Sequence, residues 1–215
     1  MKRSCAVAVL SSFLASAGAL AQMPENITDL EVSLLPGYCR DTWGFGRGSW
    51  SADPKWVAIM GQGFMAMHHY CWALIKLRRV EKPGVPPVVQ QGARENALGD
   101  LYYVVKNSQR DFVMLPEIYT KIGEVQLLLK RYSNAAETFE LARSLKPDYW
   151  PAYFHWAEHL RQSGHKAKAR AMVEEGLAYS PDAKPLQSLL VTLGGDPSAI
   201  QPRHPPPTAS APESQ

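Results

Sequence analysis

The sequence predicts an all-α fold in which antiparallel helical hairpins stack against one another. Three observations predict it. Apolar residues recur at spacings of three and four in several segments, which places them on one face of a helix. Pro147 and Pro181 lie 34 residues apart, and the segments before them share one order of large and small side chains. Glycine and proline separate the periodic segments, where the chain must reverse direction.

The N-terminal residues 1–21 are typical of a secretory signal peptide. Lys2 and Arg3 give a basic start, residues 6–14 are apolar, and residues 19–21 (ALA) form a small-residue cleavage pattern. The apolar stretch is shorter than the roughly 20 residues that cross a bilayer. An uncleaved anchor is the alternative. We therefore expect export to the bacterial periplasm, without stable membrane insertion once this segment is removed.

Charge and length restrict the possible functions. The chain has 215 residues and a net charge of +3, of which Lys2 and Arg3 contribute two positive charges. Without them the chain is nearly neutral, and it has no basic run. A nucleic-acid binder needs a concentrated positive surface, so we expect no nucleic-acid partner. The length allows one domain with a sizeable core.

Export also makes a disulfide the expected state of the cysteines. Only Cys39 and Cys71 follow the signal peptide, and an even number in an oxidising compartment favours pairing. The bond would stabilise the fold by about 3–4 kcal/mol. It would also attach residues 22–59, which are rich in tryptophan and glycine and are predicted to be irregular, to the helical domain at residues 60–195.

Two helices are predicted to form the first hairpin of this domain. The first covers residues 60–80, and the second runs from about Val88 to Ser108. The apolar face of the first helix contains Met60, Phe64, Met67, Cys71 and Leu74. The inner side of the second contains Ala97, Leu101, Val104 and Val105. Prolines and a glycine between residues 83 and 87 mark the turn.

Residues 116–149 and 150–183 repeat one pattern. The matched pairs are Tyr119 with Tyr153, Ile122 with Trp156, Gly123 with Ala157, Ala135 with Ala169, Phe139 with Val173, and Ala142 with Gly176. Paired helices approach closely only where side chains are small, and large residues fill the neighbouring holes. The two segments resemble the tetratricopeptide-repeat (TPR) superfamily, which has this order of large and small residues and this period. Gln126 and Leu160 depart from it, since the family usually has tyrosine there.

The resemblance implies a short TPR-like solenoid with a concave face lined by the first helix of each pair. The partner-binding residues that it implies are Glu117, Thr120, Glu124 and Leu127 in the first repeat, and Phe154, Glu158 and Gln162 in the second. Carboxylates, an aromatic ring and an amide suit an extended or helical peptide.

Both ends of the repeats need a cover, because each repeat exposes an apolar face. The first hairpin covers one end. A capping helix within residues 184–195 covers the other with Leu186, Leu189, Leu190 and Leu193, and ends at Gly194 and Gly195. Residues 196–215 are rich in proline, serine and alanine, so we expect a disordered tail.

Two alternatives involve a metal. His155, Glu158 and His159 form an H-x-x-E-H pattern, which in a zinc-dependent hydrolase would supply two ligands and a general base. A metal-binding protein without hydrolase activity could instead hold copper or zinc from one side of a helix, through His68 and Cys71, three residues apart, or through His155 and His159, four apart. The repeat pattern already explains Trp156 and Ala157, and no third zinc ligand stands out downstream. The sequence therefore favours a protein that binds a protein or peptide partner of the cell envelope as a scaffold or adaptor, with no catalytic residue and no cofactor.

Overall fold

The computed structural model describes residues 23–45 and 53–203, so the predicted signal peptide lies outside the described residues. The described residues are helical and contain no β-strand, which confirms the all-α prediction. Within these ranges no helix combines the length and the apolarity that a bilayer crossing requires.

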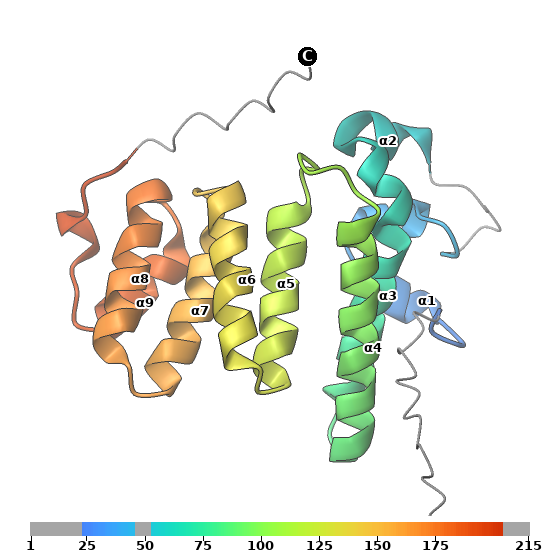
Figure 1. Cartoon of the computed structure of the whole chain (residues 1–215), viewed down its shortest axis with the longest axis horizontal. Coiled ribbons are helices and arrows are strands. Elements are labelled where there is room, and N and C mark those ends of the chain that lie inside the picture. The colour runs from blue at the N-terminus through green and yellow to red at the C-terminus, as the bar shows by residue number, and fades with distance from the viewer. Residues whose placement is uncertain (1–22, 46–52, 204–215) are drawn as a thin grey trace, which may run out of the picture.

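The main helices pack in consecutive pairs. Their bounds are α3 Met67–Val80, α4 Pro87–Lys106, α5 Leu115–Leu128, α6 Tyr132–Leu145, α7 Trp150–Gln162, α8 Lys166–Tyr179 and α9 Lys184–Thr192. The helices α3 and α4, α5 and α6, and α7 and α8 contact each other most extensively, and α4 with α5 and α6 with α7 join the pairs. Figure 1 shows these helices side by side in chain order, with α9 at one end.

The first predicted helix begins later than the sequence suggested. The apolar spacing pointed to one helix over residues 60–80, but α2 (Pro54–Met60) ends at Gly61, whose φ is +88°. The 3-10 helix η2 (Gln62–Ala66) then leads into α3. Gly61 has the left-handed backbone that glycine adopts without strain, so the spacing continues across a break in the helix. The second predicted helix is confirmed as α4.

The segment before α3 is less irregular than expected. It contains α1 (Asp29–Ser33), the 3-10 helix η1 (Gly37–Asp41) and α2. The predicted disulfide between Cys39 in η1 and Cys71 in α3 is confirmed. Both cysteines are fully buried in an apolar cluster with Leu35, Phe45, Trp72 and Ile75. The segment is therefore packed on α3 as well as covalently bound to it.

A second link holds this segment to the C-terminal half of α3. The Arg79 guanidinium donates to both Glu31 carboxylate oxygens at 2.6 and 2.9 Å, and to the backbone carbonyls of Glu25 and Asn26. Glu31 also accepts from the Thr28 backbone N–H at 2.9 Å, which completes a capping box at the start of α1. The Arg79 and Thr28 hydrogen bonds lower the pKa of Glu31 to about 2.

Small residues lie buried where the paired helices meet. Ala135, Ala142, Ala157 and Ala169 have no exposed surface. A Cβ on Gly123 would lie 2.8 Å from the Phe139 ring, and a Cβ on Gly176 would lie 2.8 Å from Tyr153 and from Leu186. These separations are shorter than carbon–carbon contact, so the alternation of small and large residues sets how closely the helices pack.

Buried polar groups join neighbouring helices. Asp100 of α4 is fully buried, and its two carboxylate oxygens contact His69 Nδ1 at 2.8 Å and Lys76 Nζ at 2.6 Å, both from α3. The Gln126 amide of α5, at a position where the family usually has tyrosine, donates to the Tyr102 hydroxyl and accepts from Thr138. The buried side chains of Asp100 and Gln126 are thereby hydrogen-bonded across helix interfaces.

A helix, α9, lies where the sequence predicts a capping helix, and it buries Leu186, Leu189 and Leu190 against α7 and α8. Part of the predicted disordered tail is ordered. Residues 197–199 form a short 3-10 helix, η3, and the Arg203 backbone N–H donates to the carbonyl of Ala178. Residues 204–215 lie outside the described residues.

Candidate functional site

Two adjoining depressions form one groove across α3, α5 and α7. The first has a volume of about 150 Å³ and lies between the C-terminal half of α3 and α5. The second has a volume of about 430 Å³ and lies between α5 and α7. Glu81, Glu124 and Leu128 border both. The second volume is within the range of protein sites that hold ligands, and we call the two depressions together the α3–α5–α7 groove.

Four of the seven residues predicted to face a partner line the second depression. They are Glu124, Leu127, Glu158 and Gln162. Glu124 and Leu127 come from one side of α5, and Glu158 and Gln162 lie four residues apart on α7. Since α5 and α7 pack side by side, their facing edges bring these residues together.

The other three predicted residues lie elsewhere. Glu117, near the start of α5, accepts a hydrogen bond from the Tyr70 hydroxyl of α3 and so belongs to the interface between these helices. Thr120 is 2% exposed, and its hydroxyl donates to the carbonyl of Pro116 at 2.8 Å. Phe154 packs edge-to-face on Trp150 and against the α7–α9 core. None of the three lines the groove.

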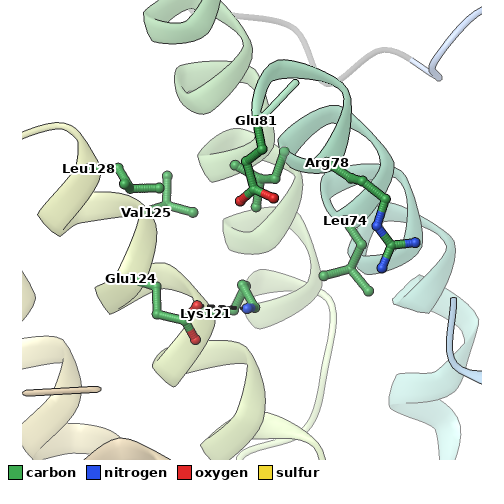
Figure 2. A pocket seen from close by; sticks show the side chains of 8 residues that line it. Leu74, Arg78, Glu81, Lys121, Glu124, Val125 and Leu128 are labelled. Carbon is green, nitrogen blue, oxygen red and sulfur yellow. Dashed lines mark hydrogen bonds and ion pairs between the residues drawn. The ribbon is translucent and has the colours of Figure 1, made fainter. Parts of the chain in front are cut away.

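Two of the groove carboxylates form ion pairs with residues three positions away on the same helix. Lys121 Nζ contacts Glu124 at 2.8 Å, and Arg161 contacts Glu158 at 2.6 Å. The Arg161 and Gln162 hydrogen bonds lower the pKa of Glu158. Figure 2 shows the Lys121–Glu124 pair on α5 and the Glu81 carboxylate between α3 and α5, while the Arg78 guanidinium points away from α5. Among the described residues Glu81 forms no ion pair.

Two histidines form part of the groove wall. His155 Nε2 lies 3.5 Å from a Glu124 oxygen, and the His159 ring is stacked between Tyr132 at 5.1 Å and Trp156 at 5.3 Å between ring centroids. Burial lowers the pKa of both histidines, which favours their neutral forms. The second depression has three carboxylates and no lysine or arginine in its lining.

The contacts of Cys71, His68 and Glu158 make them poorly suited to the alternative metal and hydrolase sites. Cys71 is bonded to Cys39, so it offers no thiolate to share with His68. The His68 Nδ1 atom contacts the Met65 carbonyl at 3.0 Å. Glu158 is held by Arg161 with a lowered pKa, which makes it a weak general base. Within the described ranges no three His, Cys, Asp or Glu side chains are placed to hold a metal.

Sequence reasoning missed several residues of the groove. Glu81 follows α3, outside the repeats, and Leu128 and Tyr132 flank the turn between α5 and α6. The helical spacing gives one signal, because Leu128 is four residues after Glu124 and therefore lies beside it. For Glu81 the sequence contains no such signal, since its position depends on how α3 packs near α5.

Comparison of the chain with family models, curated proteins and solved structures finds no match.

Proposed function

We propose that this protein is an exported, TPR-like scaffold or adaptor that binds a protein or peptide partner of the bacterial cell envelope in the α3–α5–α7 groove. The observation that carries the proposal is the convergence of Glu124, Leu127, Glu158 and Gln162 on one depression of about 430 Å³. The repeat register predicts these residues at a partner surface, because the first helix of each pair faces the concave side.

Two further features support the proposal. The buried disulfide between Cys39 and Cys71 suits an oxidising compartment such as the periplasm. Leu128 and Tyr132, at the edge of the groove, are 46% and 49% exposed. Exposed apolar side chains beside charged ones are typical of a surface that a partner covers.

A matched pull-down tests the groove. The chain lacking residues 1–21 serves as bait for envelope extracts, with Leu128→Glu in the groove and Val191→Glu on α9 as the control. Val191 is 61% exposed and lies outside the groove. We expect a protein that the wild type and Val191→Glu capture and that Leu128→Glu loses. A set of captured proteins that is the same for all three baits would contradict the proposal.

Export has its own test. We expect the protein purified from envelope fractions of its host to begin at Gln22, which mass spectrometry of the intact chain measures. A chain that retains Met1 in the cytoplasmic fraction would refute the proposed localisation.

A further inference from the structure

The charge and the apolar edge of the groove together indicate which partner side chain it accepts. Glu81, Glu124 and Glu158 line the second depression, and the lining contains no lysine or arginine. A segment of like charge would be repelled there, whereas a cation would be attracted. The second depression therefore favours a cation over an anion, although Lys121 and Arg161 already pair with two of its three carboxylates.

A cation from a partner can replace Lys121 or Arg161 in the existing ion pairs with the groove carboxylates. The two ion pairs are Lys121–Glu124 and Arg161–Glu158. In each pair the residues are three apart on one helix, and the side chains are 25–35% exposed. Exposed pairs of this kind contribute little to stability. Glu81 forms no ion pair in the part of the chain that the structure describes. As the C-cap residue of α3, Glu81 also lies at the negative end of the helix dipole, where a cation is favoured.

The edge of the groove distinguishes arginine from lysine. Tyr132, His159 and Trp156 are stacked with interplanar angles of 21° and 27°, and Tyr132 is half exposed. A planar guanidinium stacks on an aromatic face and also pairs with a carboxylate through two parallel hydrogen bonds. Leu127 and Leu128 border the same depression and can cover the aliphatic part of the side chain.

We propose that the groove binds a polypeptide segment through an arginine side chain, which stacks on Tyr132 and pairs with a carboxylate of the second depression, where Glu81, Glu124 and Glu158 lie. The inference rests on the proposed function, because it names the chemistry of the partner at the same groove. It places the aliphatic part of the arginine against Leu127 and Leu128.

Selection from a phage-displayed library of random linear peptides tests the proposal. The chain lacking residues 1–21 is the target, and peptides that also bind Leu128→Glu are removed as independent of the groove. We expect the remaining peptides to be enriched in arginine over lysine. Replacing that arginine by citrulline, which keeps the shape without the charge, should weaken binding at least about tenfold.

Variants of the protein complete the test. The triple variant E81Q/E124Q/E158Q should weaken the selected peptides at least about tenfold, and Glu174→Gln should leave the affinity unchanged. Glu174 is the matched control because it also forms a surface ion pair, with Arg170, but outside the groove.

The outcomes separate the two proposals. Groove-dependent peptides that lack arginine, or that bind the triple variant with unchanged affinity, would overturn the arginine inference and leave the groove as a binding site. A selection without groove-dependent peptides would count against both the proposed function and the inference.

Discussion

Gly123 illustrates how a single residue sets the distance between two helices. Its backbone faces the Phe139 ring, and a Cβ at this position would lie 2.8 Å from a ring carbon. Gly92 is also within a helix, α4, but a Cβ there would have no neighbour within 4 Å. The two glycines therefore separate the steric role of a small residue from its effect on helix propensity.

Alanine substitution at the two positions should act in opposite directions. Gly123→Ala forces Phe139 to move, and we expect it to lower the free energy of unfolding by roughly 1 kcal/mol after the helical advantage of alanine is included. Gly92→Ala should raise it by about 0.5–1 kcal/mol. Urea unfolding followed by circular dichroism measures both. Equal stabilisation by both substitutions would show that the contact between Gly123 and Phe139 is not tight.

At the scale of the elements, the segment around α1 and η1 depends on its links to α3. The disulfide joins Cys39 to Cys71 across 32 residues, and the Glu31–Arg79 pair adds a second connection. The links act differently, because the disulfide restricts the unfolded chain whereas the ion pair acts only in the folded one.

Removing the disulfide should be costly. We expect the double variant C39A/C71A to lose about 3–4 kcal/mol of unfolding free energy, because the unfolded chain regains the freedom of the closed loop. Thermal unfolding by calorimetry measures the loss, and limited proteolysis should detect faster cleavage within residues 23–45. An unchanged melting temperature would mean that packing alone holds this segment.

The Glu31–Arg79 pair should make stability depend on pH. The hydrogen bonds lower the pKa of Glu31 to about 2 in the folded chain, while the unfolded chain has the ordinary value near 4.5. The unfolded state therefore binds more protons, and the contribution is complete above about pH 4.5 and disappears as the pH falls to about 2. The stability difference between the wild type and Glu31→Gln should shrink over this window. A difference that stays constant from pH 7 to pH 3 would contradict this assignment.

The sequence predicted helix positions best where apolar and polar side chains recur at helical spacing within one helix or one helix pair. The start of α4 after Pro86 and the end of α9 before Gly194 follow from the apolar spacing and from the prolines and glycines beside them. The apolar spacing did not reveal the helix end at Gly61, because the apolar residues keep their spacing where the helix is interrupted. The contact of Asp100 with His69 could not be predicted either, because a helical pattern does not say which polar residues face each other between helices.

The candidate site was predictable to a smaller extent. The repeat register predicted Glu124 and Glu158 on the first helices of the two repeats, and both line the second depression. It could not show that the Thr120 hydroxyl donates to a carbonyl of its own helix. Glu81 belongs to a hairpin without a recognisable repeat, so its place in the groove depends on tertiary packing alone.

On the scale of the whole molecule, each helix pair contacts mainly its neighbours along the chain. One apolar cluster covers α3, α4 and α5, another lies between α6 and α7, and a third joins α7, α8 and α9. Stability in such an arrangement is approximately a sum of terms for each pair and each interface. A defect at one end should therefore weaken that end more than the other.

Leu190→Ala in the capping helix tests this expectation. Leu190 is fully buried, so its truncation should cost about 2–5 kcal/mol, while Val191→Ala, at an exposed position, should cost less than about 0.5 kcal/mol. Hydrogen exchange read by mass spectrometry should show lost protection in α7 and α8 with little change in α3 and α4. Equal loss along the whole chain would indicate a single cooperative unit.

We propose above all that a partner polypeptide binds in the α3–α5–α7 groove. Photo-cross-linking in the native host tests it most directly, with a benzoyl-phenylalanine placed at Gln162 in the groove or at the exposed Glu137 on α6. We expect a discrete cross-linked partner from position 162 that is lost when Leu128→Glu is added, and none from position 137. A partner cross-linked equally from both positions, or only from position 137, would contradict the account.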